Sequence, residues 1–159
     1  MLLVLILSNC GGKSEETPDT PSMYEQLELS SWGSSSASPP DAPCDLATGP
    51  RVLTVTARPP RLSWDLCAMT TANIVERQTG TRELDRSAIT AVQDALRKIS
   101  PTDTTVCRFD APVLTLNWWS ADGVQSLADN CPWGPVEGRL LVKGLDSLEH
   151  SLYALKPDQ

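Results

Sequence analysis

Several features of catalytic and metal-binding proteins are missing from the sequence. It contains one histidine, His150, and no two cysteines separated by two residues, so a structural zinc site is not expected. The patterns GxSxG, HExxH and GxGxxG and the phosphate-binding loop are also absent, and the acidic residues show no spacing that singles out a pair for acid–base catalysis. We therefore predict no metal, no cofactor and no enzymatic activity.

The sequence also has fewer basic than acidic residues. The chain has 13 Lys and Arg against 20 Asp and Glu, a formal net charge of -7. A phosphate backbone gives such a chain no electrostatic attraction, so nucleic acid is not expected as a partner. Residues 11–43 have one Lys and six acids, a net of -5, which leaves a net of -2 for residues 44–159. The sequence divides into an acidic segment and a nearly balanced body.

Long apolar runs are absent too. Residues 2–7 are uniformly apolar, but as a helix they would cover only about 10 Å of the roughly 30 Å of hydrocarbon that a spanning helix must cross. This short run ends in Leu7-Ser8-Asn9-Cys10, with Gly11-Gly12 directly behind it. The segment resembles the lipobox of bacterial lipoproteins.

The lipobox resemblance implies that residues 1–9 are a signal peptide, cut before Cys10, and that the Cys10 thiol is acylated. Two or three acyl chains attach a protein stably to a membrane, because each buried CH₂ contributes about 0.8 kcal/mol. The expected location is the cell envelope, with the chain held to a membrane by the lipid anchor, and the outer membrane if the cell has one.

The acidic segment, residues 11–43, is dominated by Ser, Pro, Glu, Asp, Thr and Gly. Such a composition buries too little apolar surface to offset the entropy lost on ordering, so we predict a disordered tether. A tether of this length would hold the body about 30 Å from the bilayer. Residues 23–29 and Trp32 are its apolar exception, which we interpret as a transient helix or a docking spot.

Cysteine usage in the body indicates disulfides. With Cys10 set aside, an even number of cysteines remains, and in an oxidising compartment this predicts two bridges with three possible connectivities. We favour the two pairs that close local loops, each of which would stabilise the domain by roughly 3 kcal/mol in the chain-entropy model. The favoured pairs are Cys44–Cys67 and Cys107–Cys131.

Segments of the body alternate apolar and polar residues as half-buried strands do. In one of them Leu62, Trp64 and Leu66 share a face, which indicates a buried position for Trp64. The predicted strands are residues 51–57, 61–67, 113–119 and 124–129, with 139–143 as a short edge strand.

Residues 84–99 and 146–155 repeat apolar side chains every three or four positions, so we predict two amphipathic helices. Asp85 and Asp146 are the expected N-caps. The predicted fold class is α+β: a small antiparallel sheet of four to five strands, two helices packed on one face, and two disulfides.

The aromatic residues are unusual, since five Trp stand against one Phe and two Tyr. Trp offers a large, rigid contact area and is enriched in binding hot spots. Trp119 must point away from its neighbour Trp118 on the strand, and Trp133 lies in a Pro-Trp-Gly-Pro loop. These two residues are candidates for contacts with an envelope protein or a cell-wall glycan.

Residues 88–131 carry a second resemblance. A helix is followed by a cysteine, an Asp and a Pro that lead into a strand, and a hairpin ends at Asn-Cys. This order is similar to the C-terminal half of the subtilisin-inhibitor-like family of serine protease inhibitors. The resemblance implies a reactive loop at Cys107–Pro112 that presents Phe109 to an extracellular protease, with Arg108 before it and Asp110 across the scissile bond.

The sequence thus predicts a lipid-anchored envelope protein in three parts: a signal peptide (1–9), a lipidated cysteine with its tether (10–43), and a globular domain (44–159). The domain is expected to bind a partner without catalysing a reaction. Two alternatives remain open, a secreted-type serine protease inhibitor and a cell-wall glycan binder.

Overall fold

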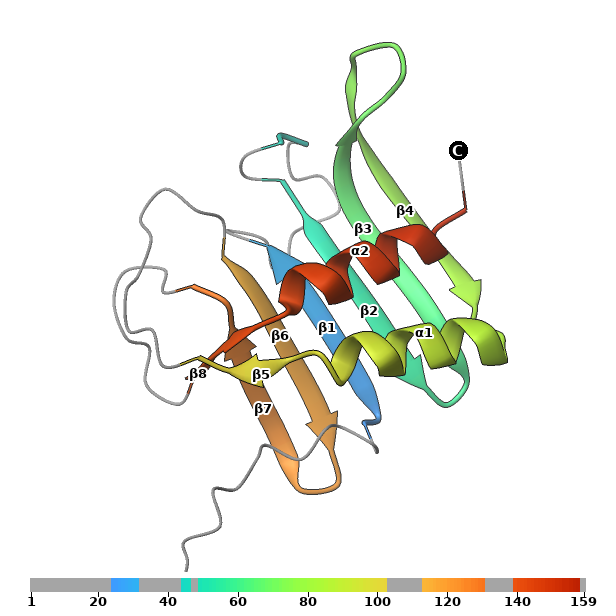
Figure 1. Cartoon of the computed structure of the whole chain (residues 1–159). Coiled ribbons are helices and arrows are strands. Elements are labelled where there is room, and N and C mark those ends of the chain that lie inside the picture. Colours follow the sequence, from blue (N-terminus) through green and yellow to red (C-terminus); the bar gives the residue numbers. More distant parts are fainter. Residues whose placement is uncertain (1–23, 32–43, 47–48, 103–112, 131–138, 158–159) are drawn as a thin grey trace, which may run out of the picture.

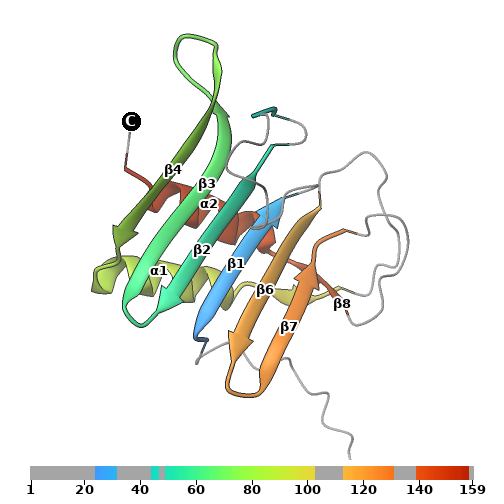
Figure 2. The ribbon, with the colours of Figure 1, turned by 180° about the vertical axis from the view of Figure 1, so that it is seen from behind.

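The computed structural model describes residues 24–31, 44–46, 49–102, 113–130 and 139–157. In these ranges the chain forms one mixed eight-stranded sheet and two α-helices. Both helices lie across the same face of the sheet (Figure 1), and no described helix covers the opposite face, which Figure 2 shows from behind. The elements are β1 (Gln26–Ser31), β2 (Arg51–Ala57), β3 (Pro60–Met69), β4 (Val75–Glu83), α1 (Arg86–Leu96), β5 (Ser100–Pro101), β6 (Leu114–Ser120), β7 (Gly123–Ala128), β8 (Arg139–Lys143) and α2 (Leu145–Leu155).

The strands follow one another across the sheet in the order β4-β3-β2-β1-β6-β7-β8-β5. Neighbouring strands are antiparallel except β7 and β8, which are parallel. β1 pairs with β2 on one side and with β6 on the other, and so joins the meander β2-β3-β4 to the second half of the sheet. β8 was predicted as an edge strand, but the short strand β5 pairs with its outer side.

The predicted fold class is therefore wrong. We predicted an antiparallel sheet of four to five strands with two disulfides. The described residues form eight strands, include a parallel pair and contain one disulfide. The two amphipathic helices do lie on one face of the sheet, as expected.

The disulfide joins Cys44 to Cys67 on β3, with the two Cα atoms 5.5 Å apart, which is one of the pairs that we favoured. It holds the segment before β2 against the end of β3. Gly49 lies in this segment because a Cβ there would overlap the Cys67 sulfur. Cys107 and Cys131 lie outside the described residues.

β1 comes from the segment that we predicted to be a disordered tether. Its side chains alternate, and Leu27 and Leu29 are each 2% exposed in the core beneath the helices. The disorder prediction was based on the average composition of residues 11–43, and such an average does not register a short alternating stretch. The tether prediction is wrong for residues 26–31, and most of the remaining segment lies outside the described residues.

β4 is an edge strand that the sequence pattern did not reveal. Three of its residues face the helices, and none of them is apolar with a side chain: Gln78, Gly80 and Arg82. Gln78 and Arg82 bond to the end of α2, and Gly80 leaves room for a neighbouring side chain. The Arg82 guanidinium donates to the Leu155 carbonyl over 2.6 Å, and the Lys156 ammonium donates to the Gln78 side chain over 2.6 Å. A Cβ at Gly80 would overlap the indole ring of Trp64.

α1 begins as predicted. The Asp85 side chain accepts a hydrogen bond of 2.8 Å from the Ala88 backbone N–H, and this N-cap bond lowers the pKa of the Asp85 carboxyl. The prediction of Asp146 as the N-cap of α2 is wrong. Gly144 occupies that position with φ of 99°, and a Cβ there would lie 2.7 Å from the Lys98 carbonyl oxygen. The close approach of two backbones therefore fixes the start of α2, and Asp146 falls in its first turn.

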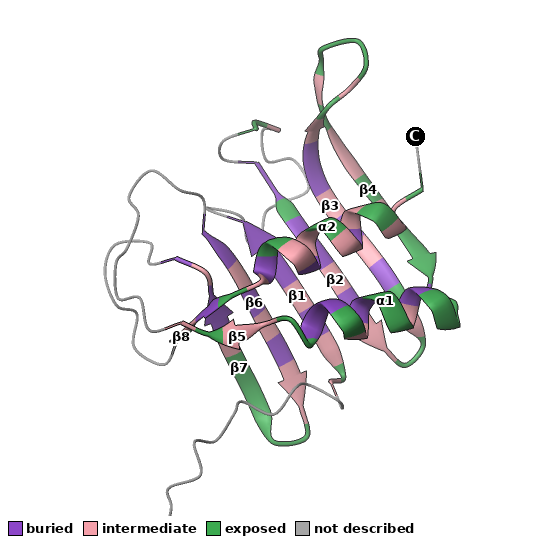
Figure 3. Ribbon diagram, in the orientation of Figure 1, coloured by how far each residue is buried: buried purple, intermediate pink, exposed green. Residues whose placement is uncertain are grey.

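The core lies between the helices and the sheet, as the buried positions in Figure 3 indicate. α1 contributes Val92 and Leu96, and α2 contributes a stripe of leucines, in each case spaced three or four residues apart. The fully buried leucines of the core are Leu62, Leu116, Leu145 and Leu148, each 0% exposed. None of the described helices is long and apolar enough to cross a membrane.

Candidate binding face of the sheet

Alternation along each strand gives the sheet two faces of different chemistry. On β2, Leu53 and Val55 belong to the core under the helices, and the residues between them point to the other side. We call that other side, with no described helix over it, the open face (Figure 2).

The strand pairing aligns polar side chains into rows on the open face. One row crosses six strands, and its members are partly buried or exposed. Because directly paired residues have Cβ atoms about 5 Å apart, each side chain lies beside the next. From β4 to β7 the row consists of Thr81, Ser63, Thr54, Glu28, Asn117 and Ser126.

A depression of about 450 Å³ lies on the open face over β2, β3 and β4. This volume is within the range of ligand pockets in proteins. Val52, 4% exposed, is its buried apolar residue on β2. The lining residues are Val52, Thr54, Ser63, Trp64, Asp65, Thr79, Gly80 and Thr81.

An ion pair lies at one side of the depression. Arg77 donates to both carboxylate oxygens of Asp65, from Nε and from Nη2, over 2.7 Å each. The side chains are 19% and 31% exposed. This two-point geometry fixes the orientation of both planar groups and cancels their charges.

The hydroxyl groups of the depression are largely uncommitted. Ser63 Oγ lies 3.5 Å from the Thr54 carbonyl oxygen, which is at the limit of a hydrogen bond. The hydroxyls of Thr54, Thr79 and Thr81 make no hydrogen bond to the part of the protein that the structure describes. These groups remain able to donate to, and accept from, a bound molecule.

Trp119 lies on the same face, one row away. It pairs with Gln26 on β1 and with Val124 on β7, whose side chain is 60% exposed. Its neighbour Trp118 is 6% exposed and faces the helices. The prediction that the two indoles point in opposite directions is confirmed, and Trp119 is partly buried.

The structure does not place the other predicted site residues. The lipidation site, one predicted pair of cysteines, the proposed reactive loop Cys107–Pro112 and the second candidate tryptophan all fall in ranges outside the description. These residues are Cys10, Cys107, Arg108, Phe109, Cys131 and Trp133.

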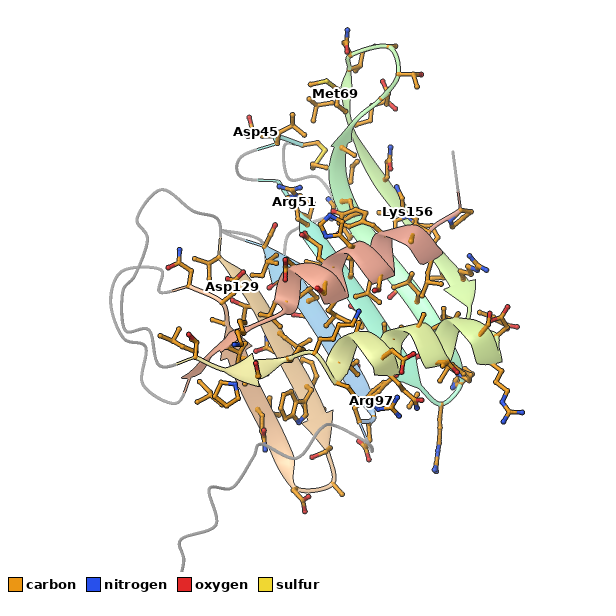
Figure 4. All side chains as sticks on the ribbon, viewed as in Figure 1. Asp45, Arg51, Met69, Arg97, Asp129 and Lys156 are labelled. Carbon is orange, nitrogen blue, oxygen red and sulfur yellow. A yellow bond between two sulfur atoms is a disulfide. The ribbon has the colours of Figure 1, made fainter. Side chains whose placement is uncertain are left out.

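A second group of titratable side chains lies on the helix side, near the start of α2. Figure 4 shows Arg51 and Asp129 at this end of the sheet. Asp129 accepts a hydrogen bond of 2.8 Å from the Leu114 N–H. Burial raises the pKa of its carboxyl, and burial also raises the pKa of Glu149, against the attraction of Arg51.

His150 lies on the exposed side of α2, as expected, with Nδ1 2.8 Å from the Asp146 carbonyl oxygen. Among the residues that the structure describes, no three His, Cys, Asp or Glu side chains are placed to hold a metal ion. Arg51 on β2 makes a side-chain hydrogen bond with Tyr153 on α2 and attracts the Glu149 carboxylate, so this group has a structural explanation. The open face is the better candidate for a binding site.

Sequence reasoning missed the hydroxyl groups of the depression. The signal was present as two Thr-x-Thr patterns, at residues 54–56 and 79–81. It could not be interpreted because the second lies on the unpredicted strand β4.

Comparisons with family models, with curated proteins and with solved structures found no match to this chain.

Proposed function

We propose that this chain is a lipid-anchored protein of a bacterial cell envelope, and that its domain binds a partner through the open face without catalysing a reaction. The observation that carries the proposal is the depression of about 450 Å³ on the open face, where three threonine hydroxyls have no hydrogen bond within the described residues. Small molecules bind to proteins preferentially at concave sites with a few convergent polar groups.

The proposed location has two supports. Leu7-Ser8-Asn9-Cys10 resembles a lipobox, and an acylated Cys10 would hold the domain at a membrane surface. The disulfide Cys44–Cys67 is the kind of bond that persists in oxidising compartments such as the periplasm or the cell surface.

Binding without catalysis agrees with the chemistry of the depression. A hydroxyl nucleophile needs an adjacent general base. The carboxylate of the depression, Asp65, is held in a two-point ion pair with Arg77. Its oxygens are thereby positioned to stabilise the guanidinium rather than to remove a proton from Ser63 or Thr79.

The anchor is tested by growing the host with an alkyne-tagged fatty acid and measuring label on the protein. The wild-type chain is expected to carry label and to fractionate with membranes, and Cys10→Ala is expected to lose both. Thr90→Val, on the exposed side of α1, is the control, because it lies outside the lipobox and should keep the label. An unlabelled wild type, or label retained by Cys10→Ala, would overturn the anchor.

The binding face is tested by retention of the purified, unlipidated full chain (Cys10→Ala) on isolated envelopes of the host. Thr54→Lys introduces a charge into the depression and is expected to lower retention at least about tenfold. Thr90→Lys, on the exposed side of α1, is the control. Equal retention of the Thr54→Lys and Thr90→Lys variants would exclude the open face as the binding surface.

A further inference from the structure

We propose that the depression on the open face binds a neutral carbohydrate, a chain of a few sugar units that extends from the threonine hydroxyls to Trp119. This inference rests on the proposed function, since it names the ligand class of the same face.

The charge of the depression favours a neutral ligand. Its acid, Asp65, is neutralised by Arg77 at 2.7 Å. The adjacent Glu28 in the next strand of the row would repel an anion. A phosphate or sulfate group would need a surplus of positive charge, and the lining residues of the depression supply none.

The polar groups match hydroxyl-bearing molecules. Thr54, Ser63, Thr79 and Thr81 each present a hydroxyl, which is both a donor and an acceptor. The Asp65 carboxylate keeps further lone pairs that can accept from a ligand hydroxyl. Sugars carry closely spaced hydroxyls of the same two-way capacity, whereas an aliphatic ligand would leave the lining groups without partners.

Trp119 provides a surface for the apolar face of a sugar ring. It lies on β6, and Thr54 lies on β2, with β1 between them. The two residues are two strands and one row apart, a separation of about 12 Å from the usual strand spacing and rise. An oligosaccharide of a few units bridges such a distance, and Glu28, Gln26 and Asn117 line the path between the ends.

A protein partner fits the depression less well. Protein interfaces are organised around aromatic or aliphatic anchors in well-packed pockets. The depression instead offers Ser63 and three threonines around one buried valine, Val52. Its aromatic lining residue, Trp64, packs its indole against Gly80 in the core on the helix side. Self-association through the open face is the competing outcome, and the experiment below distinguishes it from sugar binding.

The experiment is a titration of the purified full-length Cys10→Ala chain with neutral trisaccharides. The probes are the β-1,4-linked trimer of N-acetylglucosamine, cellotriose and maltotriose, followed by tryptophan fluorescence and by calorimetry. Saturable binding of at least one of them below about 1 mM is expected, as for a site with few contacts. A sulfated trisaccharide of the same length is expected to bind at least tenfold more weakly.

Matched variants locate the site. Thr54→Val and Thr81→Val remove a hydroxyl with little change of shape, and each is expected to raise the dissociation constant about threefold to tenfold. Trp119→Ala should raise it about tenfold or more. Thr90→Val, on the exposed side of α1, should leave it unchanged, and circular dichroism establishes that each variant is folded.

Three results would overturn the inference. One is no saturable binding of any neutral trisaccharide up to about 10 mM. Another is binding that is unchanged in Thr54→Val, Thr81→Val and Trp119→Ala. The third is sedimentation that reveals self-association abolished by Thr54→Lys, with no sugar binding. If, in the first case, the Cys10→Ala chain is retained on envelopes and the same chain with Thr54→Lys is not, the proposed function stands and the carbohydrate fails.

Discussion

The two faces of the sheet are made from alternate residues of the same strands, yet they differ in what they contact. Leu53 and Val55 on β2 pack beneath the helices, whereas Thr54 between them lies on the open face. The helix-facing side is dominated by leucine, and its side chains reach 0% exposure. The open face keeps polar groups at a depth where water is partly excluded. The buried apolar side chains are thus concentrated on the helix-facing side of the sheet.

The strongest test of this division compares neighbours on the central strand β6. Leu116→Ala removes a fully buried side chain that pairs with Leu29 and Leu127, and it is expected to lower the free energy of unfolding by about 2–5 kcal/mol. Thr115→Ala, one residue away on the open face, is expected to lower it by about 1 kcal/mol or less. Urea denaturation followed by tryptophan fluorescence measures both, and similar losses would contradict the division.

A second test concerns the edge strand β4. Gly80→Ala places a methyl group against the indole of Trp64 on the helix side, and is expected to destabilise the domain by about 1–3 kcal/mol through overpacking. Thr79→Ala and Thr81→Ala, the flanking positions on the open face, serve as controls and should each change stability by less than about 1 kcal/mol. A neutral or stabilising Gly80→Ala would mean that Trp64 can move away without loss.

A third test addresses the ion pair at the side of the depression. Asp65→Asn breaks the two-point ion pair with Arg77, whose atoms lie 2.7 Å apart. The expected loss is about 1 kcal/mol, because both groups retain some contact with water. Because the pair keeps some contact with water, salt screens it in part, and the difference between wild type and variant should shrink as NaCl is raised to about 1 M. A loss that does not depend on salt would assign the effect to packing.

The sequence pattern predicted those elements whose local signals agree with their tertiary environment. The hairpin β2–β3, the hairpin β6–β7 and α1 with its Asp85 cap follow from alternation, helical spacing and capping chemistry. α2 was found, although the contact of Gly144 with the Lys98 backbone shifted its start. These elements are stabilised by their own amphipathic pattern, which is visible in the sequence.

The strands that the sequence pattern did not predict are stabilised mainly by contacts with neighbouring strands and helices. β1 is short and lies in an acidic segment, and it is a strand because β2 and β6 pair with both of its edges. β4 turns polar residues toward the helices because the end of α2 offers hydrogen-bond partners. β5 has only two residues. The candidate site depends on this pairing, so its residues could be identified only once the strand order was known.

The smallest expected effect on stability comes from Glu149 on the helix side, whose carboxylate is partly buried. Burial raises the pKa of Glu149 above the ordinary value of 4.5, in spite of the attraction of Arg51, and Asp129 and Asp146 add to the increase. The folded state therefore binds the proton more tightly than the unfolded chain does. The stability that this provides is complete below pH 4.5 and is lost as the pH rises through the raised pKa.

Glu149→Gln should consequently be more stable than the wild type at pH 7 and equal to it at about pH 4, because the wild-type carboxyl is then protonated and uncharged like the amide. Thermal midpoints measured across this pH range report the difference. Glu76→Gln, which removes an exposed acid on β4, is the control and should shift the curve little. If the Glu149→Gln variant were the less stable at pH 7, the attraction between Glu149 and Arg51 would outweigh the desolvation of the carboxylate.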